Sequence, residues 1–245
     1  MSPNAATGFN GRAGWIASRP IAHRGLHDKA TGIFENTLGA ARRAVEQGFG
    51  IEVDLHPSSD HVPMVFHDDT LERLTSQTGS MRDRSAQELN GIRVGGSEDG
   101  IPTLQQLLDL VQGKVPLVLE MKGIKGLDDG FVAAIGKVLA GYHGPVALMS
   151  FDHWLIEDAH RLLPHVPLGL TAEGDDSHFA EHDAIAKACD VDFVSYGIRD
   201  LPCRFVQEFR ESGRPVITWT IRNRDDMAKS ARHADQITFE GFDPR

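Results

Sequence analysis

The segment Gly50-Ile51-Glu52-Val53-Asp54-Leu55-His56 decides how the rest of this sequence is interpreted. Apolar and ionisable residues alternate strictly along it, and successive side chains of a β-strand point to opposite faces. A strand here places Glu52, Asp54 and His56 on one face, among β-branched residues where unpaired charge is costly to bury. Two interpretations stay open at this point. The polar face is either a solvated or ion-paired edge, or a site where closely spaced carboxylates bind a hard divalent cation.

Short apolar runs recur along the chain and alternate with amphipathic segments. We predict eight principal strands, at 20–25, 50–56, 116–122, 146–151, 167–171, 192–198, 215–221 and 236–240, with a shorter run at 64–67. Helical spacing occurs between them, at 36–47, 104–111, 128–139, 153–163, 179–188, 204–212 and 224–231. Every principal strand except the last precedes a helix. This order indicates a parallel sheet, and it fits a TIM (β/α)8 barrel better than a doubly wound open sheet.

The predicted barrel is one catalytic domain over residues 20–245, preceded by an N-terminal extension at 1–19. We expect residues 1–12 to be loosely packed. The eighth helix is absent or reduced, and the N-terminal segment is a candidate to replace it. Residues 70–101 form a polar excursion that is longer than a usual connection, so we expect a functional insertion or lid there.

Composition excludes several classes of protein. Apolar residues make up 40% and charged residues 24% of the chain, which are ordinary globular values. A net charge of -10 argues against a nucleic-acid partner. Cys189 and Cys203 have no metal-binding or redox spacing, so we expect free thiols in a reducing compartment. Because no secretory or transmembrane segment is evident, we expect a cytoplasmic protein without stable membrane anchoring.

In a barrel of this kind, functional side chains lie at the C-terminal ends of the strands. The predicted strand ends carry mostly ionisable side chains, namely His23, Arg24, Asp54, His56, Glu120, Lys122 and Trp219. Each also has a structural interpretation: a histidine bonded to backbone, a Glu120–Lys122 ion pair, or a tryptophan packed in the core. Their concentration at one end of several strands favours a functional site.

Several short motifs occur in an order that resembles the glycerophosphodiester phosphodiesterase family. They are His23-Arg24-Gly25, Glu35-Asn36-Thr37, Glu52-Val53-Asp54, Val65-Phe66-His67-Asp68, Ile101-Pro102-Thr103-Leu104, Leu119-Glu120-Met121-Lys122, Ser150-Phe151 and Thr218-Trp219-Thr220. Each motif is weak alone, but their ordered combination from about residue 20 to residue 240 is specific. The resemblance implies a TIM-barrel enzyme that hydrolyses glycerophosphodiesters, a small-molecule substrate, to glycerol 3-phosphate and an alcohol.

The resemblance also implies the machinery of this reaction. Its metal ligands fall on Glu52, Asp54 and Glu120, and its two catalytic histidines fall on His23 and His67. Carboxylates without a thiolate favour Mg²⁺ or Ca²⁺ over zinc. In the mechanism proposed for similar enzymes, one histidine deprotonates the vicinal hydroxyl of the substrate, which attacks phosphorus to form a cyclic phosphate, and the other protonates the leaving alcohol. We expect His23 to be the base and His67 the acid.

Four further residues match substrate-binding positions of the family. Arg24 and Lys122 match positions near the phosphate, and Trp219 matches an aromatic residue on the alcohol side of the pocket. Glu35, together with Asn36, matches a motif at the start of the first helix, where we expect the two residues to support the site by hydrogen bonding.

The sequence departs from the family pattern at three places. Asp60-His61 stands where Asp-Gly is usual, Arg222 where asparagine commonly follows the strand, and Phe239-Glu240 where Thr-Asp is common. We expect these positions to lie at the pocket rim and to change the alcohol accepted rather than the reaction.

Two alternative functions stay open. A lysophospholipase D-like enzyme would use the same carboxylates but needs apolar surface for an acyl chain, and residues 70–101 contain few large apolar side chains. A non-catalytic barrel that only binds a phosphate ligand predicts the loss of a metal ligand or histidine, whereas all five positions are filled.

Overall fold

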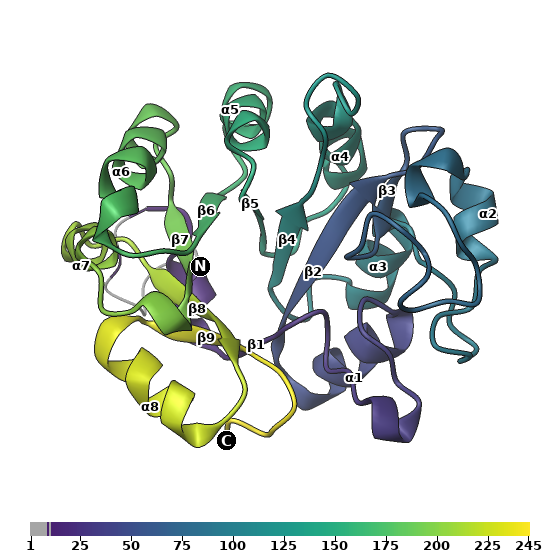
Figure 1. Cartoon of the computed structure of the whole chain (residues 1–245), viewed down its shortest axis with the longest axis horizontal. Helices are drawn as coiled ribbons and strands as arrows, with labels where there is room; N and C mark the ends of the chain where they lie inside the picture. Colours follow the sequence, from purple (N-terminus) through teal and green to yellow (C-terminus); the bar gives the residue numbers. More distant parts are fainter. Residues whose placement is uncertain (1–8, 10) are drawn as a thin grey trace.

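Eight parallel strands close into a barrel in the computed structural model, which describes residues 9 and 11–245 (Figure 1). They are β1 (Ile21–Ala22), β2 (Gly50–Pro57), β4 (Leu117–Met121), β5 (Val146–Ser150), β6 (Leu168–Ala172), β7 (Phe193–Gly197), β8 (Val216–Ile221) and β9 (Gln236–Phe239). Closure occurs at β1, where Ile21 pairs with Gly50 of β2 and with Thr238 of β9. The predicted TIM barrel is confirmed.

Helices cover the outside of the barrel between successive strands (Figure 1). They are α1 (Leu38–Gln47), α3 (Leu104–Val111), α4 (Phe131–Leu139), α5 (His153–Leu162), α6 (Phe179–Ala188), α7 (Arg204–Glu211) and α8 (Arg224–His233). Their starts follow local chemistry: Thr103, for example, forms a capping box with Gln106 that satisfies backbone N–H groups at the start of α3. Within the described residues no helix follows β9.

The N-terminal segment closes the bottom of the barrel and does not replace the missing helix. Its 3₁₀ helix η2 (Gly14–Ser18) inserts buried Ile16 into a cluster with Ile21 and Ile217, whose side chains fill the barrel. Gln236 at the start of β9 donates to the carbonyl of Ala17 at 3.1 Å. The loose packing expected of residues 1–12 falls largely on residues 1–8 and 10, which lie outside the described part of the chain.

The excursion after β2 is a folded insertion with its own apolar cluster. It contains β3 (Pro63–Val65), antiparallel to β2, the 3₁₀ helix η4 (Met81–Asp83) and α2 (Ala86–Asn90). Eight buried side chains form its core: Met64, Phe66, Leu71, Leu74, Met81, Leu89, Val94 and Ile101. Polar composition concealed this core, because the apolar residues are few and widely spaced in the sequence. The β2–β3 turn places His61 at φ 59°, the left-handed conformation expected where glycine is usual.

All the helices in the described part of the chain are too short or too polar to cross a bilayer.

Candidate active site

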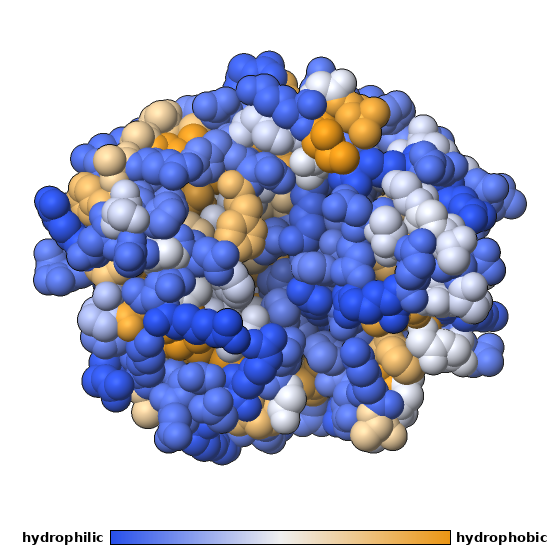
Figure 2. All heavy atoms as spheres, in the orientation of Figure 1, coloured by the Kyte–Doolittle hydropathy of each residue, from blue (hydrophilic) through white to orange (hydrophobic). Residues whose placement is uncertain are grey.

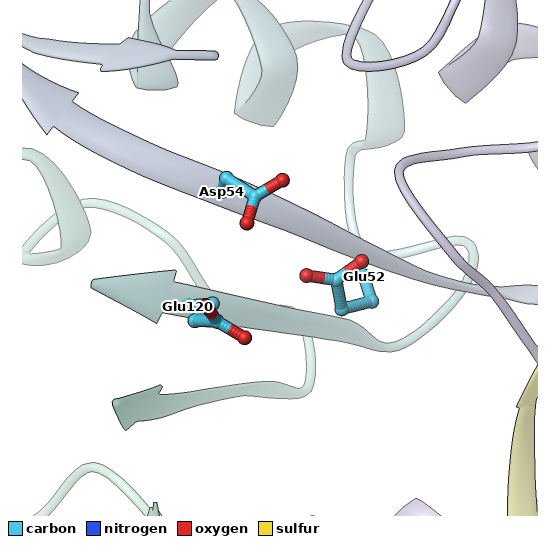
Figure 3. A group of neighbouring side chains, drawn as sticks. All are labelled: Glu52, Asp54 and Glu120. Carbon is cyan, nitrogen blue, oxygen red and sulfur yellow. The ribbon is translucent and has the colours of Figure 1, made fainter. Parts of the chain in front are cut away.

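Three carboxylates meet at the C-terminal ends of β2 and β4. Strand alternation puts Glu52 and Asp54 on the inner face of β2, and the parallel register sets Asp54 directly beside Glu120 of β4. One ligand oxygen from each residue lies within 4.8 Å of the others, and all three side chains are buried (Figure 3). This arrangement brings together the three predicted metal ligands.

The electrostatics of the three carboxylates favour a cation. Burial and the neighbouring negative charges raise the pKa of Glu52, and burial chiefly raises the pKa of Glu120. Burial would also raise the pKa of Asp54, but the positive charges of Lys122 and Arg24 outweigh it and hold that pKa below its usual range. Three buried anions at such short range repel one another, and a donor set made only of carboxylate oxygens suits Mg²⁺ or Ca²⁺. The residues therefore fit the metal that the sequence predicted.

His23 follows β1 and lies beside the carboxylate cluster. Its Nδ1 is 2.6 Å from Oε2 of Glu240, and its Nε2 is 4.0 Å from Oε2 of Glu52. Burial lowers the pKa of His23, against the hydrogen bond to Glu240, which raises it. Because an ionised carboxylate can only accept, Nδ1 carries the proton and the Nε2 lone pair faces the carboxylates.

His67 enters the site from the insertion, two residues after β3. Its Nδ1 is 2.6 Å from Oδ1 of Asp68, and Arg73 Nη2 donates to the same oxygen at 2.9 Å. The backbone carbonyl of His67 lies 2.9 Å from Nε2 of buried His56. Contacts with both the ring and the backbone therefore orient His67. The exposed fraction of its side chain is 33%, against 13% for His23.

Arg24 connects the two sides of the site. Its backbone N–H donates to Glu52 at 2.9 Å, its Nη1 donates to Glu35 at 2.6 Å, and its Nε lies 3.4 Å from Asp54. Arg24 adopts φ 54° and Gly25 φ 78°, and a Cβ at Gly25 would stand 2.8 Å from the Cβ of Ala40. Only glycine permits this close approach between the β1–α1 loop and α1.

Glu35 is buried and binds two arginines. Arg73 donates to Oε1 at 2.8 Å and to Oε2 at 3.1 Å, and it shares Oε1 with Arg24. Glu35 therefore holds the two arginines in place, which agrees with the supporting role expected of it. Lys122 lies 3.2 Å from Asp54 and also pairs with Glu120, so its ammonium sits among the predicted metal ligands.

Trp219 of β8 forms part of the apolar wall of the site. Its indole N–H donates to the carbonyl of Ser195 at 3.2 Å, and its ring meets Phe151 edge to face at 5.5 Å between centroids. Both rings line a cavity at the mouth of the barrel, and this is where the resemblance places the aromatic residue.

Two cavities meet at the catalytic groups, within the central hollow that Figure 2 shows. The deep one, of about 70 Å³, is lined by all three carboxylates together with both histidines. The wide one, of about 580 Å³, lies between the insertion and the β4–α4 loop, and of the three carboxylates only Glu120 borders it. His67, Glu120, Lys122 and Phe151 line both, so they stand where the two cavities join.

Sequence reasoning missed several residues that hold the site together. Asp68 and Arg73 support His67. Asp68 belongs to a motif that carried the resemblance, so its signal was present, whereas Asn36, of which a supporting hydrogen bond was expected, donates to Asp54 at 2.9 Å. Glu240 was expected only to lie at the pocket rim, and its contact with His23 was not foreseen: its carboxylate bonds directly to that ring.

Comparison with known proteins bears on these residues. A family model described as the glycerophosphoryl diester phosphodiesterase family matches residues 23–234. A glycerophosphodiester phosphodiesterase of Caldanaerobacter subterraneus is 28% identical over 221 residues, which cover 85% of this chain and 88% of that protein.

Solved structures show the same architecture. An Oleispira antarctica phosphodiesterase in complex with the product sn-glycerol 3-phosphate superposes with a TM-score of 0.81 at 25% identity, over 90% of this chain and 92% of the other. A glycerophosphodiester phosphodiesterase of Thermotoga maritima superposes with a TM-score of 0.73 at 21% identity, over 89% and 92% of the two chains, and shares the fold.

Proposed function

This chain belongs to the glycerophosphoryl diester phosphodiesterase family and hydrolyses glycerophosphodiesters, and we propose that it does so with one divalent cation and two histidines, His23 and His67. The observation that carries the proposal is the buried cluster of Glu52, Asp54 and Glu120 with a histidine on either side. A cation bound there supplies positive charge for a phosphoryl oxygen and orients the glycerol hydroxyls.

We assign the two halves of the substrate, glycerol phosphate and the leaving alcohol, to the two cavities. Because the three carboxylates line the deep cavity, we place the glycerol and the phosphate there, and the leaving alcohol in the wide cavity. Arg24 lines the deep cavity and Lys122 lies where the two cavities join, and their charges offset the negative charge that develops on the phosphoryl oxygens. Trp219 and Phe151 form the apolar wall against which the substrate packs.

The histidines divide the proton transfers between them. His23 Nε2 accepts the proton of the vicinal glycerol hydroxyl, whose oxygen then attacks phosphorus and closes a cyclic phosphate. The bond from phosphorus to the alcohol oxygen breaks, and protonated His67, at the border of the wide cavity, gives that oxygen a proton. Water then opens the cyclic phosphate with the roles reversed, which returns both histidines to their starting states and yields glycerol 3-phosphate.

Net charge and cysteine usage bear on the partner and on the location of this enzyme. The net charge of -10 disfavours a nucleic-acid partner, and the two buried free cysteines agree with the reducing cytoplasm proposed as its location.

A lysophospholipase D-like activity is the second candidate, and one observation favours it. Four large hydrophobic side chains are exposed among the described residues, and two of them, Ile124 and Phe151, line the wide cavity. A third, Leu127, lies in the turn that follows Ile124. Figure 2 shows orange atoms above the central hollow, over the segment that enters α4. The apolar surface comes from these loops and not from residues 70–101 of the insertion, where it was expected to be needed.

The proposal is tested by removing the metal and restoring metals one at a time. We expect chelation to abolish hydrolysis of glycerophosphocholine, and Mg²⁺ or Ca²⁺ to restore it. The same metal should raise the melting temperature of the parent but not of Glu52→Gln, because that variant loses a ligand. Glu46→Gln, an exposed carboxylate on α1, is the matched control and should behave like the parent.

Further arms of this experiment separate the candidates. His23→Ala and His67→Ala should each lose about 100-fold or more in kcat. A lysophospholipid hydrolysed faster than glycerophosphocholine would favour the second candidate. Activity that survives both chelation and Glu52→Gln would refute the metal mechanism.

A further inference from the structure

The two departures at the ends of β8 and β9, Arg222 and Glu240, meet in the folded chain. Arg222 Nε donates to Oε1 of Glu240 at 2.7 Å, while Oε2 of the same carboxylate is 2.6 Å from Nδ1 of His23. One carboxylate thus joins an arginine to the proposed base. We propose that Glu240 is a positioning residue that aims His23 at the substrate, and that Arg222 holds Glu240 in the conformation that does so.

The backbone places these residues side by side. Ile221 of β8 pairs with Phe239 of β9, and the N–H of Glu240 donates to the carbonyl of Ile221 at 3.0 Å. β9 is also the neighbour of β1 in the closed barrel, and the N–H of His23 donates to the carbonyl of Phe239 at 2.9 Å. Register therefore fixes the three backbones, and only the side chains need restraint.

Restraint is needed because a glutamate side chain has three rotatable bonds. Holding it in one rotamer costs more conformational entropy than holding the shorter aspartate. Arg222 engages the carboxylate oxygen that His23 leaves free, so both oxygens have a fixed partner. Arg222 thus offsets the flexibility that Glu240 has relative to the shorter aspartate that is common at this position.

The carboxylate also sets the tautomer of His23. Burial would raise the pKa of Glu240, but its hydrogen bond with His23 and the charge of Arg222 hold that pKa well below its usual range, so it accepts from Nδ1–H. The opposite nitrogen, Nε2, then faces the carboxylate cluster without a proton. His27 Nε2, 3.7 Å from the same Glu240 oxygen, borders the pair on its other side. A base needs this tautomer to accept a proton from a hydroxyl.

The test compares four variants of the full chain with the restoring metal bound: Glu240→Gln, Glu240→Asp, Arg222→Asn and the double variant Glu240→Gln/Arg222→Asn. We expect Glu240→Gln to lower kcat about 10- to 100-fold with KM within about twofold, because the site keeps its ligands but the base loses its orientation. Glu240→Asp keeps a carboxylate and should retain more activity than Glu240→Gln. Arg222→Asn should lower kcat several-fold.

The double variant tests whether Arg222 acts through Glu240. If it does, Arg222→Asn lowers kcat in the parent but has no further effect in the Glu240→Gln background. Arg204 and Glu208 of α7 form an exposed pair with the same 2.7 Å contact, away from the site. Arg204→Asn and Glu208→Gln should leave kcat unchanged.

An NMR measurement reports positioning without turnover. In chains with ¹⁵N-labelled histidine, the His23 signal is identified by its loss in His23→Ala, and the parent should show the Nδ1–H tautomer. Glu240→Gln should weaken this preference and Glu240→Asp should restore it. Parent-like kcat and tautomer in Glu240→Gln, or additive losses in the double variant, would overturn the inference.

The inference rests on the proposed role of His23, and the two can fail separately. If His23→Ala is as active as the parent, the proposed mechanism fails whatever Glu240 does. If His23→Ala is inactive while Glu240→Gln matches the parent in kcat and tautomer, only the positioning role fails.

Discussion

At the scale of single residues, a chain of charged side chains beside the carboxylate cluster holds the site. His67, Asp68, Arg73, Glu35 and Arg24 form a continuous chain of hydrogen bonds from one side of the site to the other. Glu35 is buried at the centre of this chain with an arginine on each side, and Asp68 and Arg73 connect it to the ring of His67. Leaving the Glu35 charge without partners is costly, so these contacts favour one arrangement of the site.

Glu35 makes the stability of the protein depend on pH. Burial would raise its pKa, but hydrogen bonds from Arg73 and the charge of Arg24 outweigh it and lower the pKa to about 2. Because the folded-state pKa lies below the unfolded value, the ionised carboxylate stabilises the fold above about pH 4.5, and this contribution is lost as pH falls toward about 2.

We therefore expect Glu35→Gln to be less stable than the parent at pH 7, by about 1–3 kcal/mol. The two proteins should converge in stability as pH falls from 4.5 toward 2. Urea unfolding at several pH values in this range measures the effect. A constant difference between parent and variant at every pH would contradict the assignment.

At the scale of elements, one arginine ties the insertion to the barrel. Arg82 of η4 donates to Asp128 before α4 at 2.9 Å and to Nδ1 of His56 on β2 at 3.0 Å, and it also pairs with Asp69. Because arginine only donates, His56 accepts at Nδ1 and donates from Nε2 to the carbonyl of His67. Burial lowers the pKa of His56 to about 4, so the ring is neutral at pH 7.

We expect Arg82→Met to lower the free energy of unfolding by about 2–4 kcal/mol, because Asp128 and His56 lose their partner while remaining buried. It should also lower kcat, since His56 then no longer fixes the backbone of His67. Arg93→Met removes an exposed arginine of the same insertion and should change stability by less than about 0.5 kcal/mol. Equal urea midpoints for Arg82→Met and the parent would exclude the anchoring role.

At the scale of the whole molecule, one end of the barrel contributes to stability and the other carries the catalytic groups. Ile16 packs against Ile21 and Ile217 at the N-terminal end of the strands, whereas the carboxylates and histidines lie at the C-terminal end. Stability and chemistry are thus separated by the length of the strands, as is usual for this fold.

We expect Ile16→Ala to lower the free energy of unfolding by about 2–4 kcal/mol, because it removes a fully buried side chain and leaves a cavity. Below its melting temperature, kcat and KM should stay within about twofold of the parent. Leu162→Ala, an exposed position on α5, should lose less than about 1 kcal/mol. A large change in KM for Ile16→Ala would show that the two ends are coupled.

Much of the fold and part of the site follow from local patterns. The eight barrel strands and seven of the helices match the predicted segments within a few residues, because periodicity and capping are properties of neighbouring residues. The alternation over 50–56 placed Glu52 and Asp54 on one face of a strand before any contact was known. The family resemblance added Glu120 and the histidines.

Only the tertiary structure decided how distant segments complete the site. Glu240 reaches His23 across 217 residues, and this contact exists because β9 closes the barrel beside β1. Similarly, the insertion gains a core, and Ile16 enters the barrel, through packing among residues far apart in the chain. The sequence by itself determined the strands, the helices and the chemical groups they carry. Closure and register decided which of those groups meet, because both depend on the packing of all the strands together.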